Sequence, residues 1–193
     1  MIKNYFKIAW RNLVKSKGYS SINIIGLATG MAVALLIGLW IWDEVSYNKY
    51  FPQHEKLAQL MTTQTFNDVV GTGSAVSMAI ATELRIKNTS DFKYVTLSSW
   101  NFDHILAFED KKINQGGLWV QPEFPVMLGL KMLKGSALAL KDPSSILLTA
   151  SLAKALFGNT DPMNKTIRLD NRMDFKVAGV YEDLPRNTSF YDT

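Results

Sequence analysis

The chain has 193 residues, a net charge of +4 and no cysteine, which excludes a disulfide framework, thiolate metal sites and cysteine catalysis. The net charge alone would suit a nucleic-acid binder. However, five of the 21 Lys and Arg residues precede position 19, which leaves 16 against 17 Asp and Glu; the remainder carries −1, and we expect no nucleic-acid partner.

Residues 1–18 are predicted to form a basic, amphipathic segment on the cytoplasmic side of a membrane. Lys3, Lys7 and Arg11 recur at four-residue intervals. Apolar side chains gather on another side of the same predicted helix, namely Ile2, Phe6, Trp10, Leu13 and Val14. This pattern is typical of a helix that lies in the headgroup plane. The simpler alternative is that the charges only set the topology of the adjoining span.

Residues 19–42 contain no charged side chain and are predicted to form a transmembrane helix. Such a helix would be about 36 Å long, and the hydrocarbon core of a bilayer is about 30 Å thick. Tyr19 at one end and Trp40 and Trp42 at the other are the aromatic rings expected at the two interfaces. Because the cationic flank should stay cytoplasmic, residues 43–193 are expected to lie outside the cytoplasm. A cleaved signal peptide is disfavoured, because its apolar run would be shorter and an A-x-A-like site would follow.

A row of small residues at four-residue intervals lies within the predicted span: Gly26, Gly30, Ala34 and Gly38. Small residues on one stripe let another helix backbone approach closely, so we assign these four a helix-packing role. The alternative is chance, because glycine is common in membrane helices. A lone anchor would not need such a row, which therefore suggests further membrane helices from this or another chain.

Residues 43–193 are predicted to form one mixed α/β domain, so the fold class is α+β with an N-terminal transmembrane helix. Within its first part, helices are expected over 77–86 and in the later part of 46–60. Strands are expected over 92–100, 104–108 and 117–120, with a polar turn at 109–114.

The last quarter has the clearest local signals. A short apolar strand at 146–148 is followed by Thr149, which can cap a helix that Gly158 ends. Ile167 and Leu169 alternate in a further strand, and Asp170-Asn171 is a plausible turn before a strand that ends at Tyr181.

Several linked motifs in this region resemble the periplasmic core domain of MacB-like, FtsX-type ABC transporter permeases. They are Ser144–Thr149, Ala153–Gly158, Asp161–Ile167, Phe175–Val180 and Leu184-Pro185. The N-terminal part is similar to the first membrane helix of the same family and the segment just outside it, through Ala9–Leu13, Lys15–Lys17, the Gly26/Gly30 span and Glu44–Phe51. The family usually has glycine where Asn164 stands, and asparagine is the next residue most tolerant of a left-handed turn. Family members carry further membrane helices after this domain, so the resemblance implies an N-terminal fragment whose core domain is incomplete at its C-terminal end.

The resemblance implies a permease-like subunit of an ABC transporter in a bacterial inner (plasma) membrane. It would couple a cytoplasmic ATPase to export or extrusion of a peptide, a drug or a lipoprotein. The implied partners are that ATPase, the lipid bilayer, a second permease subunit in a homodimer or heterodimer, and an extracytoplasmic adaptor. Two alternatives stay open: an FtsX-like regulator of an extracytoplasmic cell-wall hydrolase, and a single-span anchored binding or sensor module.

The motifs of common enzymes and cofactor sites are missing from the sequence. No G-x-x-x-x-G-K-[ST] occurs, and Gly71-Thr72-Gly73 is predicted to be a loop. His54 and His104 lie fifty residues apart without metal-ligand spacing, so each is expected to be a surface or loop residue. We therefore predict that the chain is not an enzyme and has no catalytic, cofactor-binding or metal site.

Overall fold

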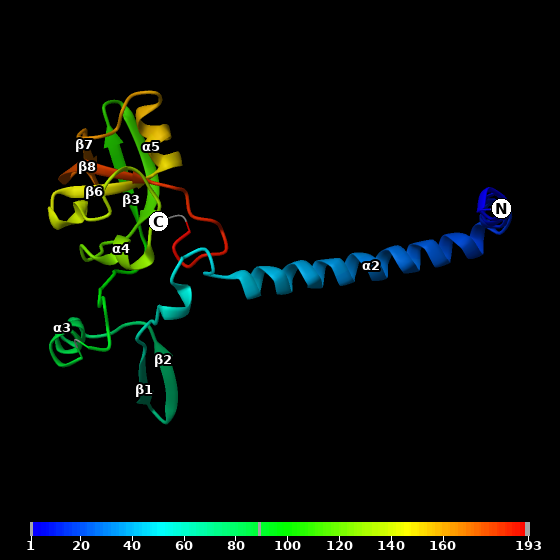
Figure 1. Ribbon diagram of the computed structural model, residues 1–193, viewed down its shortest axis with the longest axis horizontal. Helices are drawn as coiled ribbons and strands as arrows, with labels where there is room; N and C mark the ends of the chain where they lie inside the picture. Colours follow the sequence, from blue (N-terminus) through cyan, green and yellow to red (C-terminus); the bar gives the residue numbers. More distant parts are fainter. Residues whose placement is uncertain (1, 89, 192–193) are drawn as a thin grey trace. The chain divides into compact units, whose positions relative to one another are not determined.

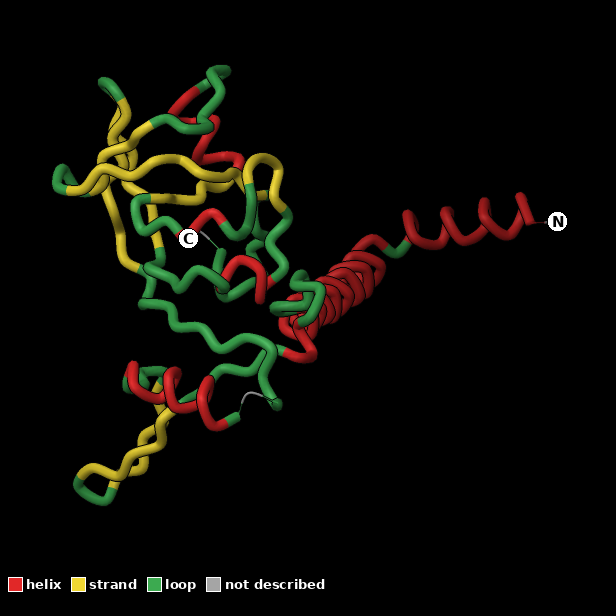
Figure 2. Tube along the Cα trace, turned by 60° about the vertical axis from the view of Figure 1, so that its left-hand side comes forward, coloured by secondary structure: helices red, strands yellow, loops and turns green. Residues whose placement is uncertain are grey.

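The computed structural model describes residues 2–88 and 90–191, and the chain divides into two compact units, Met1–Tyr47 and Asn48–Thr193. The first unit consists of two helices, α1 (Ile2–Lys15) and α2 (Lys17–Ser46). Ser16 separates them with φ −108° and ψ 58°, outside the helical region, and the break is visible between the two red helices of Figure 2. The predicted N-terminal helix is therefore present as α1.

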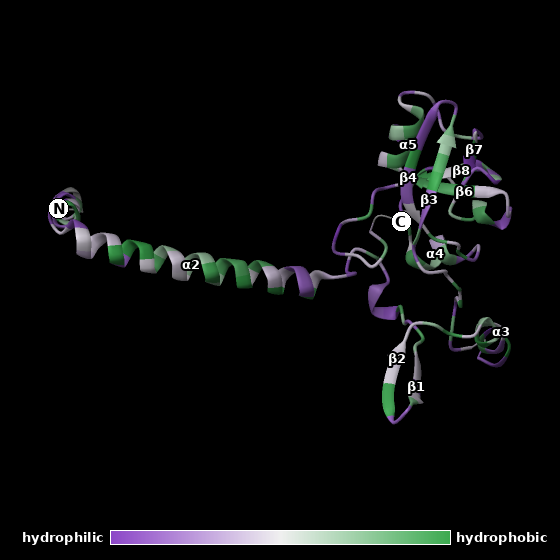
Figure 3. Cartoon of the chain, turned by 180° about the vertical axis from the view of Figure 1, so that it is seen from behind, coloured by the Kyte–Doolittle hydropathy of each residue, from purple (hydrophilic) through white to green (hydrophobic). Residues whose placement is uncertain are grey.

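The helix α2 is long and apolar enough to cross a membrane. Its 30 residues correspond to about 45 Å, and the helix extends beyond both ends of the predicted 19–42 span. None of its side chains is buried, and hydrophobic colouring runs along most of its length in Figure 3. A helix that is apolar all round requires an apolar environment outside its own unit, such as lipid or other helices.

The second unit is built on a six-stranded sheet with the order β4-β3-β7-β8-β5, and β6 pairs with β8 in parallel. Its strands are β3 (Phe102–Phe108), β4 (Lys111–Gly117), β5 (Met132–Gly135), β6 (Ser145–Thr149), β7 (Thr166–Leu169) and β8 (Met173–Tyr181). The first half of β8 pairs with β7, and the second half pairs with β5 and β6. This second half therefore has partner strands on both edges, which fits its nearly continuous burial.

Two hydrophobic clusters stabilise this unit. The first is covered by α5 (Ala150–Phe157), which contacts β3, β4, β6 and β8 (Figure 1). Its fully buried members include Leu148, Leu156, Ile167 and Val177. The second cluster combines Phe51 with the short helix α4 (Phe124–Leu128), Tyr181 and Leu184. The same strand, β8, contributes to both clusters and so connects them.

A separate two-stranded sheet is formed by the hairpin β1 (Thr62–Phe66) and β2 (Val69–Gly73). Asn67 and Asp68 make its turn with φ of 49° and 63°, the left-handed conformation that type I′ hairpin turns require. The helix α3 (Met78–Lys87) follows, with the Ser77 hydroxyl as its N-cap. Arg85 of α3 donates hydrogen bonds to the Val95 carbonyl and to Gln121.

The last quarter of the chain confirms most of its predicted elements. The Thr149 hydroxyl accepts a hydrogen bond from the Leu152 amide at 3.3 Å, and α5 ends at Phe157, directly before Gly158 with φ 62°. The Asp170-Asn171 turn has φ of 51° and 55°. Asn164 has φ 62°, the left-handed conformation that the family's usual glycine would adopt with least strain.

Several predictions for residues 50–120 are wrong. The predicted strand at 92–100 is irregular apart from one isolated bridge between Ser98 and Val120. The turn after β3 consists of Glu109 and Asp110, and the remainder of the predicted turn 109–114 belongs to β4. β4 already ends at Gly117, so residues 118–120 of the strand predicted at 117–120 do not belong to it. The predicted loop at 71–73 belongs to β2, and the expected helix in 46–60 is reduced to a 3-10 turn, η1 (His54–Lys56). A second 3-10 turn, η2 (Ala139–Lys141), precedes β6.

Candidate functional site

The row of small residues lies on α2, where Gly26, Gly30, Ala34 and Gly38 are all exposed. An added Cβ at any of the three glycines would meet nothing within 4 Å. The unit itself therefore gives these positions no reason to be small, and the helix-packing role stays a prediction about contacts with another helix.

Residues Asn48–Phe51, shortly after α2, contact residues near the C-terminal end of the second unit. We call these four residues the junction segment. Asn48 adopts φ 60°, its amide donates to the Asn187 carbonyl, and its side chain accepts from the Ser189 amide and donates to the Ser189 hydroxyl. All three bonds are 2.8 Å long. Phe51 is 1% exposed and packs edge-on against Phe190. The junction segment is thus attached to residues about 140 positions later by both hydrogen bonds and core packing.

A charged group reinforces this attachment. Glu182, the residue after β8, accepts hydrogen bonds from the Tyr50 hydroxyl at 3.0 Å and from Lys131 Nζ at 3.2 Å. Lys131 Nζ also lies 5.0 Å from the centre of the Tyr50 ring. The Lys131 and Tyr50 hydrogen bonds lower the pKa of Glu182. Burial and the neighbouring Glu182 charge raise the pKa of Tyr50.

An apolar cavity of about 220 Å³ lies within the second unit, bordered by β3, β6, β7, β8 and the segment from Gln115 to Pro125. Most of its wall is aliphatic or aromatic, with contributions from Leu106, Trp119, Leu130, Leu148, Phe175 and Leu184. Cavities with this composition are the usual setting for small-molecule binding. The cavity thus makes this part of the second unit a candidate site for a small ligand.

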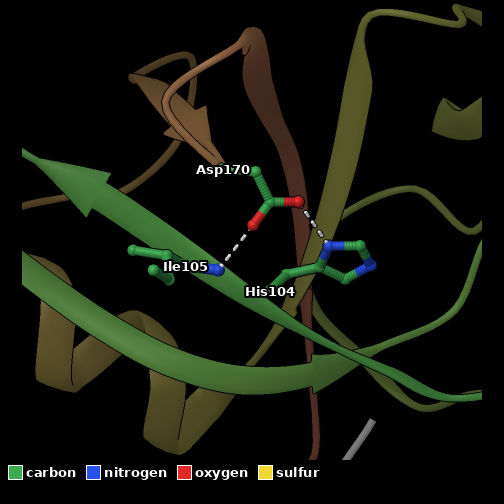
Figure 4. A network of polar contacts seen from close by, with 3 residues as sticks. All are labelled: His104, Ile105 and Asp170. Carbon is green, nitrogen blue, oxygen red and sulfur yellow. Dashed lines mark hydrogen bonds and ion pairs between the residues drawn. The ribbon is translucent and has the colours of Figure 1, made fainter.

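His104, a polar residue on the cavity wall, is hydrogen-bonded to Asp170, which lies in the turn between β7 and β8 (Figure 4). The turn between β7 and β8 brings Asp170 against β3, where its amide donates to the Ile105 carbonyl at 2.8 Å. The Asp170 carboxylate accepts from the Ile105 amide at 2.8 Å and from His104 Nδ1 at 2.7 Å. The hydrogen bond from the Ile105 amide lowers the pKa of the Asp170 carboxyl most, and the hydrogen bond from His104 lowers it further.

The prediction that His104 is a surface or loop residue is wrong. Its side chain lies in β3 and is only 14% exposed, and the Trp119 ring meets it edge-on at 6.0 Å between centroids. Its partner is Asp170, 66 positions away, and local motif reasoning cannot find a pair at that separation. His54 lies in η1, where its Nδ1 is 3.0 Å from the Phe51 carbonyl oxygen. Among residues 2–88 and 90–191, no group of three or more His, Asp or Glu side chains is arranged to hold a metal.

The chain is similar to several solved structures. A domain of a protein assigned as a permease from Porphyromonas gingivalis is 24% identical, with a TM-score of 0.55 over 68% of this chain and 57% of that chain. The periplasmic region of MacB from Actinobacillus actinomycetemcomitans is 27% identical, with a TM-score of 0.42 over 50% of this chain and 48% of that one. The extracellular domain of the noncanonic ABC-type transporter YknZ from Gram-positive bacteria is 14% identical, with a TM-score of 0.47 over 56% and 58%.

The chain spans between 48% and 58% of the length of these three structures. No curated protein sequence matches the chain. The family model of the MacB-like periplasmic core domain matches residues 20–193, which include the apolar helix from its fourth residue onward and the whole second unit. Since this match extends over most of the sequence, the chain belongs to the MacB-like periplasmic core domain family of ABC transporter permeases.

Proposed function

We propose that this chain is a permease-like membrane subunit that couples a cytoplasmic ABC ATPase to export or extrusion of a substrate of the peptide, drug or lipoprotein type. The observation that carries the proposal is the family match over residues 20–193, which includes most of the apolar helix as well as the whole second unit. The chain has no P-loop sequence, so we propose that it hydrolyses no ATP itself and depends on the partner ATPase.

The orientation is part of this proposal. Five basic residues and no acidic residue precede Tyr19, whereas Asp43 and Glu44 follow the apolar stretch. By the positive-inside rule, the N-terminus is cytoplasmic and the second unit lies outside the cytoplasm of a bacterial inner membrane. α1 then lies at the cytoplasmic face, in reach of the ATPase.

The junction segment supports a mechanical role for the outer domain. α2 ends at Ser46, and two residues later Asn48 is bonded to Asn187 and Ser189, while Tyr50 is bonded to Glu182. A displacement of α2 driven by the ATPase would therefore pull on the end of β8 and the segment after it, because few freely rotating residues separate the helix from these anchor points. A second permease subunit would complete the membrane part.

Copurification from the native membrane tests this function. The tagged full chain is cross-linked in cells, extracted and analysed by mass spectrometry, with an unrelated single-span protein under the same tag as control. We expect an ABC ATPase and a second permease subunit to be enriched with the tagged chain and not with the control protein. Enrichment of a cell-wall hydrolase together with an ATPase would instead support the regulator alternative, and the lack of any ATPase would contradict the proposal.

A further inference from the structure

The helix α1 has an exposed apolar face, made of Phe6, Trp10 and Leu13. Their side chains are 76%, 63% and 42% exposed, and every side chain from Asn4 to Lys15 is exposed. A helix of 14 residues is marginally stable in water unless one of its faces packs against another surface. The apolar face of α1 therefore requires a surface that covers it.

The basic residues of α1 form a second face, made of Lys7, Arg11 and Lys15. At about 100° per residue, their four-residue spacing places them within an arc of about 80°. The apolar face lies on the other side of the helix axis, roughly 100–160° from Arg11. No acidic residue precedes Asp43, so this part of the chain does not neutralise the basic face. The surface that fits α1 is therefore both apolar and anionic.

Ser16 joins α1 to α2 and lets the two helices run in different directions. Its amide donates to the Asn12 carbonyl at 3.2 Å, and its carbonyl accepts from the Ser20 amide at 2.9 Å, so no longer linker separates the helices. Figure 1 shows α1 nearly end-on, whereas α2 runs across the view. When α2 crosses a bilayer, α1 is held beside the bilayer surface at a high effective concentration, whereas a protein partner would have to be recruited. This placement favours lipid as the surface that covers α1.

We propose that α1 binds the anionic phospholipids of the bilayer surface. The apolar face enters the boundary between headgroups and acyl chains, and the basic face binds the phosphate groups. This inference rests on the proposed span by α2 and deepens the proposed function, because it fixes the end of the permease that faces the ATPase to the lipid. A bilayer without anionic lipid holds the helix only weakly.

Fluorescent labels on the two sides of α1 test this inference in the full chain. The chain contains no cysteine, so Ala9→Cys and Asn4→Cys each accept one NBD fluorophore, on the side of the apolar face and of the basic face respectively. The labelled chain is placed in nanodiscs of phosphatidylcholine, alone or mixed with phosphatidylglycerol, and quenched with uncharged acrylamide. In mixed discs we expect the Ala9 label to be quenched several-fold less than the Asn4 label. In phosphatidylcholine alone, the two labels should be quenched alike.

Removal of the basic face gives a second measurement. Each cation near an anionic bilayer strengthens association about fivefold, so the three together contribute on the order of a hundredfold. Replacing all three basic-face residues by glutamine should therefore expose the Ala9 label to acrylamide in mixed discs as well. The matched control replaces three exposed lysines of the second unit and should leave the shielding unchanged: Lys56→Gln, Lys112→Gln and Lys141→Gln.

Three results would each overturn the inference. Equal shielding of the Ala9 label in both kinds of disc would show that the apolar face alone docks α1. An Ala9 label quenched as strongly as the Asn4 label in mixed discs would show that α1 leaves the bilayer, and would indicate a protein partner instead. Shielding that survives removal of the basic face would show that phosphate binding is not its cause. No ATPase takes part in these measurements, so such results would leave the coupling role to the copurification experiment.

Discussion

Asp170 connects three parts of the second unit. It occupies a left-handed turn position, it accepts a bond from the backbone of β3, and it holds the ring of His104. Asp174, four residues later, forms an exposed ion pair with Arg168 instead. The two aspartates thus allow a comparison between a carboxylate that connects chain segments and one that forms a surface pair between neighbouring strands.

Asp170→Asn should lower the melting temperature of the second unit by about 2–4 °C. Asparagine tolerates the left-handed backbone, so the loss reflects the weaker bonds to Ile105 and His104. Asp174→Asn is the control and should change the melting temperature by less, because exposed ion pairs contribute little. Tryptophan fluorescence of the full chain during heating measures both, and equal shifts for the two variants would show that Asp170 has no special structural role.

The carboxylates of the second unit predict that its stability falls in acid. Hydrogen bonds and neighbouring cations hold the pKa of Asp142, Asp161, Asp170, Asp174 and Glu182 below the ordinary value. A group whose folded pKa is lowered stabilises the folded state above its unfolded pKa and loses that contribution as the pH falls through the folded pKa. We therefore expect the urea midpoint to be constant near neutral pH and to fall below about pH 4. Fluorescence-monitored urea titrations at pH 7 and pH 3 check this, and equal midpoints would contradict it.

At the scale of elements, local signals determine what can be predicted from sequence. Thr149 and Gly158 bracket α5, and Asp170-Asn171 marks the β7–β8 turn, because each requires a conformation that few other residues adopt easily. The sequence of β4 does not indicate a strand, because β4 lies at the edge of the sheet, where Lys111, Lys112 and Asn114 remain exposed. The β1–β2 hairpin is likewise not among the predicted elements, although Asn67-Asp68 is a residue pair that suits its turn.

The cavity and the junction segment depend on contacts that sequence patterns do not reveal. His104 meets Asp170 across 66 positions, and Asn48 meets Ser189 across 141. Only strand order and register bring such residues together, and neither follows from one sequence. The small-residue row on α2 can be recognised in the sequence because its spacing is a property of a single helix.

The attachment of the junction segment predicts a local effect of changing Asn48. Asn48→Gly keeps the left-handed backbone and removes the two side-chain bonds to Ser189. We expect faster amide hydrogen exchange in residues 187–191 and unchanged exchange in β3 and β7. Asn67→Gly, the same substitution at another left-handed position, in the exposed hairpin turn, is the control. Unchanged exchange in 187–191 would show that core packing by Phe51 alone fixes the segment.

For the whole molecule, the arrangement of charge around α2 predicts the topology. A periplasmic-type reporter, such as alkaline phosphatase, fused after residue 60 should be active, and a cytoplasmic-type reporter at the same position should be inactive. Substitution of Lys3, Lys7, Arg11, Lys15 and Lys17 by glutamine should reduce this asymmetry, because these residues supply the cationic bias. Activity of the cytoplasmic reporter in the unmodified chain would reverse the orientation and remove the outer domain from its proposed compartment.

The role of the small-residue row can be tested by measuring the association of subunits in the membrane. Gly30 and Leu35 are both exposed on α2, and a Cβ at Gly30 would meet nothing within 4 Å, so neither position is constrained by the first unit itself. If the row contacts a helix of a second subunit, Gly30→Leu separates the two backbones and should weaken association by about tenfold, whereas Leu35→Ala, on a different face, should have a smaller effect. A two-hybrid assay for membrane proteins, normalised to the amount of each variant in the membrane, measures the difference. Equal effects of the two substitutions would mean that the four-residue spacing arose by chance and that the subunits meet through other surfaces.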